Sequence, residues 1–254
     1  MHGESFAPFL MARYSALAMA PAQPPPALVT GLSARRCPGW LLRAAGGLAL
    51  GLSLMQFSVV AEAWDSDKVL ESAARMGPRA LAGARSLLPL VERAAQVSDA
   101  QRLALVNDFF NQRIAFREDT ETWGRIDYWA SPLETLEKGQ GDCEDYAIAK
   151  YFSLLAAGVP EARLRLVYVR AMLDGRRQAH MVLAYYSQPD AEPLILDNLQ
   201  TAVLPAGRRP DLQPVFSFNG EGLWEGVGSA SAGNPVARLS LWRDALAKVR
   251  AEGF

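Results

Sequence analysis

The chain has 254 residues, of which 50% are hydrophobic and 21% charged, and its formal net charge at pH 7 is -1. This composition provides enough apolar material to bury one substantial core, so we expect one globular domain. The lysines and arginines are scattered along the chain, which argues against nucleic acid as a partner.

The first 63 residues have the pattern of an extension followed by an export signal. An apolar run at 44–60 follows several arginines and leads to Ala-Glu-Ala at 61–63. A basic region, an apolar core and small residues before a cleavage point are the parts of a secretory signal. We therefore predict cleavage after Ala63, a mature domain over 64–254 and a periplasmic location. An uncleaved anchor in the inner membrane is the alternative, because 40–60 nearly reaches bilayer-spanning length.

Helical patterns come first in the predicted domain. Apolar spacing over 65–95 is helical but is interrupted at Gly77-Pro78, which predicts two short helices. Ser98 and Gln101 form a capping-box pattern, and the apolar residues over 103–114 keep helical spacing. The second pattern predicts an amphipathic helix.

The next stretch is expected to shape a cleft. Polar and aromatic residues over 117–131 predict a loop near that cleft, and Pro132 is expected to open a short turn. A helix is predicted over 141–158, because its closing glycine is followed by Pro160, a typical helix end. Cys143 lies in the first turn of this helix.

The last third of the chain is expected to supply the sheet. Three runs rich in β-forming residues are separated by turn signals, which predicts an antiparallel meander; the runs are 163–170, 179–186 and 193–196. After Pro205 we expect long loops, including a Gly/Ser-rich stretch at 220–234, and then a closing helix over 239–249. Helices followed by a sheet predict an α+β fold.

The cysteine and histidine content narrows the chemistry. The chain has two of each residue, and Cys37 and His2 fall in the segment predicted to be removed. The predicted domain then holds Cys143 and His180 alone. One thiol cannot form an internal disulfide, and one Cys with one His is too few for a structural zinc site.

These two residues and one aspartate have the arrangement of a thiol hydrolase. Cys143 at a helix N-terminus meets the positive end of the helix dipole, which favours its thiolate. His180 lies on the second predicted strand, and Asp197 directly follows the third, where it can orient the imidazole. We predict a nucleophile, a general base and an orienting carboxylate, in that order. The alternatives are a small buried thiol, a core histidine and a turn aspartate.

Three acidic residues surround the nucleophile candidate. Asp142, Glu144 and Asp145 would all oppose a negative charge on Cys143. They are either a helix cap with first-turn acids, or oxygen ligands of Ca²⁺, whose charge would offset theirs. Asp142 and Glu144 are the ligand candidates, and Asp145 is a further one. The sequence leaves both interpretations open.

Four segments of the chain resemble the bacterial transglutaminase-like cysteine proteinases of the LapG type. They are Trp123-Gly-Arg-Ile-Asp-Tyr-Trp-Ala-Ser-Pro-Leu-Glu, Gly141-Asp-Cys-Glu-Asp-Tyr-Ala-Ile-Ala-Lys-Tyr-Phe, Ala179-His-Met-Val-Leu-Ala-Tyr-Tyr and Leu194-Ile-Leu-Asp-Asn-Leu. The similarity extends over about residues 64 to 250, and the motif around Cys143 is long and specific.

The resemblance implies a papain- or transglutaminase-like fold and a periplasmic, calcium-dependent protease. Such a protease cleaves the N-terminal region of a large surface adhesin and so promotes biofilm dispersal. An inner-membrane receptor for cyclic di-GMP sequesters it when that messenger is abundant. The catalytic residues of the family fall on Cys143, His180 and Asp197, and its calcium ligands on Asp142 and Glu144.

Two other functions remain open at this point. A protein-glutamine transglutaminase would form the same thioester and pass the acyl group to an amine instead of water. A catalytically silent, calcium-dependent binding module is the second alternative. The presence of all three catalytic residue types argues against the silent module.

Overall fold

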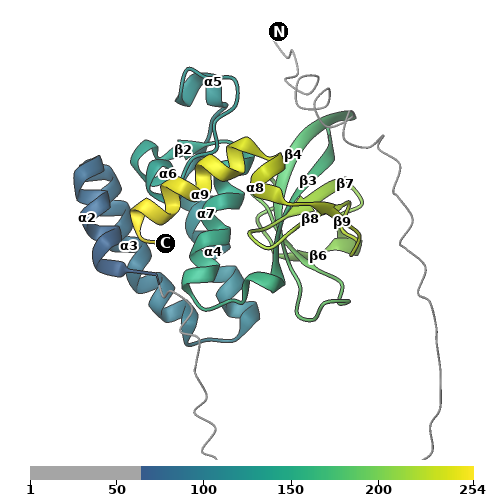
Figure 1. Cartoon of the computed structure of the whole chain (residues 1–254), viewed down its shortest axis with the longest axis horizontal. Coiled ribbons are helices and arrows are strands. Elements are labelled where there is room, and N and C mark those ends of the chain that lie inside the picture. The colour runs from purple at the N-terminus through teal and green to yellow at the C-terminus, as the bar shows by residue number, and fades with distance from the viewer. Residues whose placement is uncertain (1–63) are drawn as a thin grey trace, which may run out of the picture. The chain divides into compact units, whose positions relative to one another are not determined.

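The computed structural model describes residues 64–254, which form a seven-stranded sheet with helices packed on one face (Figure 1). The predicted N-terminal extension and signal over 1–63, with cleavage after Ala63, lie outside the described residues. Within the described part, no helix combines the length and apolar character needed to cross a bilayer. The order of elements, helices and then mainly antiparallel strands, is the predicted α+β arrangement.

The helices are mostly set by local signals. They are α2 (Ser66–Met76), α3 (Pro78–Ala95), α4 (Asp99–Arg113), α5 (Asp119–Thr122), α6 (Pro132–Lys138), α7 (Cys143–Ala156), α8 (Pro235–Arg238) and α9 (Ser240–Glu252), with 3₁₀ turns η1 (Glu161–Arg163) and η2 (Ala206–Arg208). Gly77 separates α2 from α3 as predicted, and the capping box at Ser98 begins α4.

Two local expectations were wrong. The predicted loop over 117–131 contains the short helix α5, and Pro132 begins a two-turn helix rather than a turn. Ser131 and Glu134 form a second capping box at the start of α6, which satisfies the free N–H groups there. The second N-terminal helix, α3, has the predicted bounds and continues through Pro89.

The main sheet has the strand order β6-β5-β4-β3-β7-β8-β9, with every neighbouring pair antiparallel. Its strands are β3 (Leu164–Leu173), β4 (Arg176–Tyr185), β5 (Leu194–Leu196), β6 (Leu204–Pro205), β7 (Leu212–Phe218), β8 (Leu223–Glu225) and β9 (Ser231–Gly233). β3, β4 and β5 are the predicted meander. A separate parallel pair joins β1 (Ala115–Phe116) to β2 (Gln140–Gly141).

The long loops expected after Pro205 were the largest error. β7 lies in this region and pairs with β3 in the middle of the sheet. Proline lacks an N–H and normally argues against a central strand. Here Pro214 pairs with Val169 at the register shift between Tyr168 and Val169, where the ladder is already interrupted. The tertiary pairing therefore tolerates a residue that local propensity rejects.

The turn between β3 and β4 is fixed by sequence. Asp174 and Gly175 both have positive φ, 50° and 73°, and the flanking residues Leu173 and Arg176 pair with each other. Two residues with positive φ make the hairpin turn whose twist matches that of the strands, and Asp-Gly is a favoured sequence for it. This turn sets the register of the whole β3–β4 hairpin.

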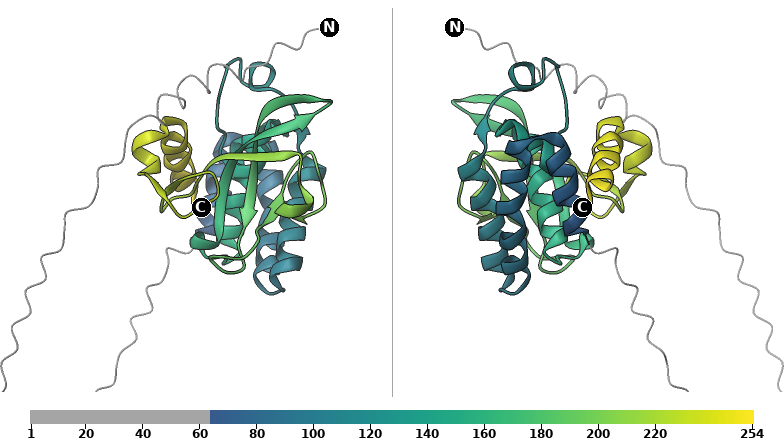
Figure 2. Two further views of the ribbon diagram at one scale, coloured as in Figure 1. Left: turned by 90° about the vertical axis from the view of Figure 1, so that its right-hand side faces the viewer. Right: turned by 90° about the vertical axis from the view of Figure 1, so that its left-hand side faces the viewer.

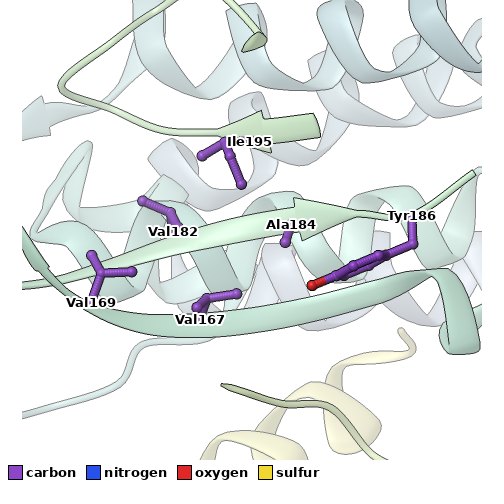
Figure 3. Close-up of a cluster of buried hydrophobic side chains, with 6 residues drawn as sticks. All are labelled: Val167, Val169, Val182, Ala184, Tyr186 and Ile195. Atoms are coloured by element: carbon purple, nitrogen blue, oxygen red, sulfur yellow. The ribbon is translucent and has the colours of Figure 1, made fainter. Parts of the chain in front are cut away.

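The sheet has buried side chains on both faces. On the helix side, Trp242 of α9 lies against Phe152 of α7 and Phe218 of β7, with ring centroids 5.8 and 5.3 Å apart. The two views of Figure 2 look at the domain from the sheet side and from the helix side. On the opposite face a second buried cluster holds the strands together (Figure 3); it consists of Val167, Val169, Val182, Ala184, Tyr186 and Ile195.

Candidate active site

Cys143 is the first residue of α7, and its sulfur lies beside β4. Its sulfur donates to Glu144 Oε2 at 2.9 Å and accepts from the backbone N–H of Met181 on β4. Gly141, two residues before Cys143, packs closely against the side chain of Asp145. A side chain at position 141 would not fit, because its Cβ would lie 2.5 Å from Asp145 Oδ2. The thiol is half-buried and, among the described residues, is unpaired with any other cysteine.

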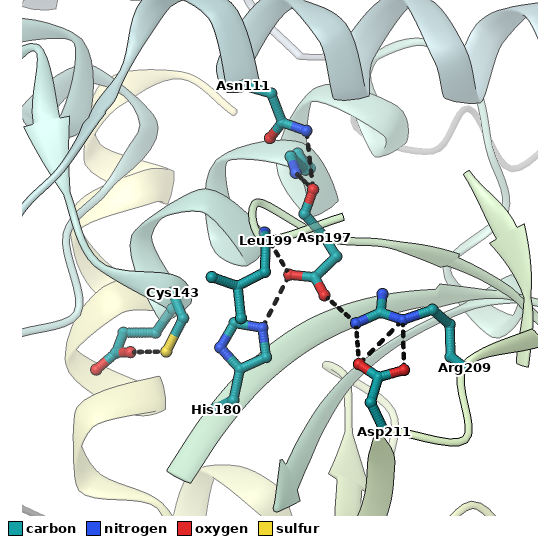
Figure 4. Close-up of polar contacts among 9 residues, drawn as sticks. Asn111, Cys143, His180, Asp197, Leu199, Arg209 and Asp211 are labelled. Carbon is teal, nitrogen blue, oxygen red and sulfur yellow. Dashed lines mark hydrogen bonds and ion pairs between the residues drawn. The ribbon is translucent and has the colours of Figure 1, made fainter. Parts of the chain in front are cut away.

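His180 and Asp197 form a buried pair next to Cys143. The distance from His180 Nε2 to Asp197 Oδ1 is 2.8 Å, and the two side chains are 5% and 0% exposed. Leu183 pairs with Leu196, so Asp197 directly follows β5 and reaches back to β4. In Figure 4 the other ring nitrogen of His180 points toward Cys143. The structure thus brings together the three residues that the sequence singled out.

Further side chains hold Asp197 in place. Arg209 Nη2 donates to Asp197 Oδ2 at 2.8 Å, and the Leu199 N–H donates to Oδ1 at 3.1 Å. Burial would raise the pKa of Asp197, but the hydrogen bond and charge of His180, then Leu199 and Arg209, outweigh it and lower the pKa to about 2. The aspartate is therefore ionised at any physiological pH.

The main chain at Asp197 is also fixed. Its carbonyl oxygen accepts from Asn111 Nδ2 at 2.8 Å and from Lys150 Nζ at 3.1 Å (Figure 4). Burial lowers the pKa of Lys150 to about 7. Sequence analysis missed Asn111, Lys150 and Arg209. Lys150 left a signal, because a lysine within the apolar run of the Cys143 helix is out of place unless it has a buried partner.

Three carboxylates meet beside the start of α7. One oxygen each from Asp119, Asp142 and Glu144 lie within 4.8 Å of one another, and the first two residues are buried. Asp142 and Glu144 are the ligand candidates predicted from the sequence, whereas Asp119, on α5, was not among them. Asp145 lies outside this group and is fully buried, with Oδ1 accepting from the Ala130 N–H at 2.8 Å.

The convergence of these acids raises their pKa values. Burial, and then the charge of Glu144, raise the pKa of Asp119 to about 7 and that of nearby Asp127 to about 6. The same two causes raise the pKa of Asp142 well above its usual value. Burial, followed by Glu144 and Asp142, likewise raises the pKa of the Cys143 thiol. This environment disfavours a thiolate unless positive charge is added.

Comparison with known proteins assigns the family. The sequence profile of the family described as bacterial transglutaminase-like cysteine proteinase matches residues 89–210. Two solved structures of Legionella pneumophila LapG, one of them of EGTA-treated protein, are each 38% identical to this chain. They cover 73% of it and 97% of their own length, with TM-scores of 0.65 and 0.63. The chain belongs to this proteinase family.

A calcium-bound structure of Legionella pneumophila LapG is also similar. It is 38% identical, covers 72% of this chain and 98% of its own length, and has a TM-score of 0.62. None of the curated proteins matched this chain. The LapG structures confirm the predicted transglutaminase-like fold class.

The acidic group of this proteinase fits a calcium ion. Within the described residues, Oδ1 of Asp119, Asp127 and Asp142 are all buried without a hydrogen-bond partner. Carboxylate oxygens are the ligands that Ca²⁺ prefers, and a divalent ion would satisfy them. The competing interpretation, that Asp142 caps the helix, is not supported, because its side chain makes no capping hydrogen bond to α7.

Proposed function

We propose that this protein is a calcium-dependent cysteine endopeptidase with Cys143 as nucleophile, His180 as general base and Asp197 as orienting carboxylate. The observation that carries the proposal is the position of the His180 ring. One ring nitrogen is bonded to the ionised Asp197, and the other points toward the Cys143 sulfur (Figure 4). This is the geometry that nucleophile, base and orienting group require.

The arrangement accounts for each proton in peptide hydrolysis. His180 takes the thiol proton as the Cys143 sulfur attacks the scissile carbonyl carbon and forms a C–S bond. The C–N bond then breaks, and His180 returns the proton to the leaving amine. A water molecule, deprotonated by His180, then attacks the thioester carbon. The C–S bond breaks, His180 returns the proton to the Cys143 sulfur, and the acid is released. Asp197 stays ionised and stabilises the imidazolium in both halves.

Asp119, Asp142 and Glu144 are the residues that would hold calcium, with Asp127 beside them. The bound ion supplies positive charge that offsets these carboxylates next to the thiol. Glu144 has a special place in this scheme, because its Oε2 is the acceptor of the Cys143 S–H. Positive charge held beside Glu144 would weaken its carboxylate as a proton acceptor, and His180 is the base in this scheme.

The substrate we propose is the N-terminal region of a large surface adhesin, cleaved in the periplasm so that the biofilm disperses. We further propose an inner-membrane cyclic di-GMP receptor as the partner that sequesters the enzyme, and export by the N-terminal signal. Membership of the LapG-type family supports these three statements.

Incubation of purified protein with an adhesin N-terminal fragment, followed by mass spectrometry, tests the proposal. With Ca²⁺ present we expect two fragments whose masses sum to the substrate plus one water. The matched control is Cys143→Ala, which should produce neither. Cleavage by this variant, or no cleavage by the calcium-loaded wild type, would contradict the proposal. A product carrying an added primary amine would instead identify a transglutaminase.

A further inference from the structure

The β4 strand has an open edge beside the catalytic residues. β3 pairs with all ten residues of β4 on one side, whereas β5 pairs only with 183–185 on the other. All residues from Arg176 to Ala179 are exposed, and all from His180 to Tyr185 are buried. Within the described part of the chain, no strand pairs with the outer edge of β4 at 176–182.

The direction of the backbone groups along β4 follows from two hydrogen bonds. The Tyr186 N–H points to the β3 side, where it donates to Arg163. The Met181 N–H points to the opposite side, where it donates to the Cys143 sulfur. Backbone groups alternate with a period of two along a strand, so those of Ala179 and Arg177 point to the same open side as Met181.

This geometry places the nucleophile in line with a missing strand. The Met181 N–H points away from β3, and it donates to the Cys143 sulfur. The sulfur therefore occupies the position that a strand paired with the outer side of β4 would take. β5 pairs with the outer side of β4 only at 183–185, and after Leu196 the chain no longer pairs with β4. A peptide lying opposite Arg177 and Ala179 would therefore arrive at Cys143 end-on, about two residues, or roughly 7 Å, beyond Ala179.

We propose that an extended segment of the polypeptide substrate adds to this edge as a strand that runs parallel to β4, toward Cys143. Its residues on the N-terminal side of the scissile bond then pair with the backbone of Arg177 and Ala179. The proposal rests on the endopeptidase function and deepens it, because it defines the substrate as an unfolded, extended chain. Strand addition is a known mode of peptide recognition, in which main-chain hydrogen bonds give affinity. His180 lies on the same strand, so pairing also sets the peptide's register relative to the base.

The charges along the edge agree with this use. Arg176 at the turn end is the kind of residue that prevents one sheet edge from pairing with another copy. Gln178 and Ala179, next to the active site, are uncharged and small enough to leave the backbone accessible. The edge is thus protected at the turn and open where the substrate would enter. The β3–β4 hairpin that carries it extends to the periphery of the domain (Figure 1).

Tetra-alanyl chloromethyl ketones provide a direct test on purified, calcium-loaded protein. Alanine keeps the peptide extended without large side chains, so the inactivation rate relative to iodoacetamide reports main-chain recognition. We expect acceleration over iodoacetamide, and a loss of roughly tenfold when an amide facing β4 is N-methylated, which removes a hydrogen bond and adds bulk. Methylation of the alternate amides should have little effect. Equal sensitivity at every amide, or no acceleration, would overturn the proposal.

A variant supplies the complementary arm. Ala179→Pro removes the outward N–H but no bond to β3, since that N–H faces the open edge, and it should abolish the acceleration by the peptide. Gln178→Ala is the matched control and should retain it, because the Gln178 N–H faces β3. Acceleration that survives in Ala179→Pro would contradict strand addition. If this variant fails to fold, the N-methyl series on wild type decides. Failure to label Cys143 with iodoacetamide would count against the proposed endopeptidase instead.

Discussion

Replacing Arg209 by methionine tests how the orienting carboxylate is held. The ion pair between Arg209 and Asp197 is buried, with side chains 5% and 0% exposed and an Nη2 to Oδ2 distance of 2.8 Å. Methionine has a similar length but no charge. The substitution leaves Oδ2 of Asp197 without its charged partner, while Oδ1 keeps His180 and Leu199.

The expected loss of stability is large for a single substitution. Removing one partner of a buried ion pair costs about 3–5 kcal/mol, because the other charge is left uncompensated. We expect the lower end, about 3 kcal/mol, since two donors remain on Asp197. The lowered pKa of Asp197 gives a second measure of how strongly its surroundings stabilise the carboxylate. A shift from 3.8 to about 2 means that the folded protein favours the carboxylate over the acid by roughly 2 kcal/mol.

The pH dependence has a definite sign. Asp197 has a depressed pKa in the folded state, so its contribution to stability is fully present above pH 3.8 and is lost as the pH falls to about 2. In Arg209→Met the pKa of Asp197 in the folded state rises, so the stability lost as the pH falls below 3.8 should be smaller than in wild type, and the loss should end at a higher pH.

Urea unfolding at pH 7 and fixed calcium measures the effect, with Asp211→Asn as the control. Asp211 binds the same guanidinium at 2.7 Å, but its side chain is 34% exposed, so its loss should cost less than about 1 kcal/mol. We also expect kcat to fall in Arg209→Met with little change in KM, because Asp197 acts on His180 rather than on the substrate. Equal destabilisation by the two variants would refute the reasoning.

Three further outcomes are expected. Cys143→Ala should abolish turnover and leave the melting temperature nearly unchanged, because it removes the nucleophile without opening a large cavity; residual turnover in a folded sample would contradict its role. Chelation should lower both activity and melting temperature, and added Ca²⁺ should restore both better than Mg²⁺. Asp119→Ala should abolish the response of both quantities to Ca²⁺. A chelator that changes neither would refute the calcium site. Burial raises the pKa of Glu252 to about 7, so above pH 7 the folded protein carries an unfavourable buried carboxylate. Glu252→Gln removes this carboxylate, so it should raise the melting temperature at pH 8 and change it little at pH 5. A larger stabilisation at pH 5 than at pH 8 would contradict this reasoning.

The sequence alone determined the parts of this protein that depend on near neighbours. A glycine, an aspartate and then an apolar helical run place Cys143 at a helix start, and Asp174-Gly175 sets the β3–β4 turn. The order of Cys143, His180 and Asp197 along helix, strand and strand end was also readable, because each residue adjoins a recognisable local pattern. Caps, turns and periodicity act over a few residues, so they survive in the linear chain.

Only the tertiary structure decided which distant groups meet. Asp119 joins the carboxylates at α7 because α5 contacts β2, the strand that leads into α7, and no local pattern marks Asp119 as a ligand. Arg209 reaches Asp197 from the segment after η2, and β7 joins the sheet despite Pro214 because β3 offers a register shift there. The burial of apolar surface and the pairing of distant strands determine which of these residues come into contact. They depend on contacts between segments whose separation along the chain carries no signal of their proximity.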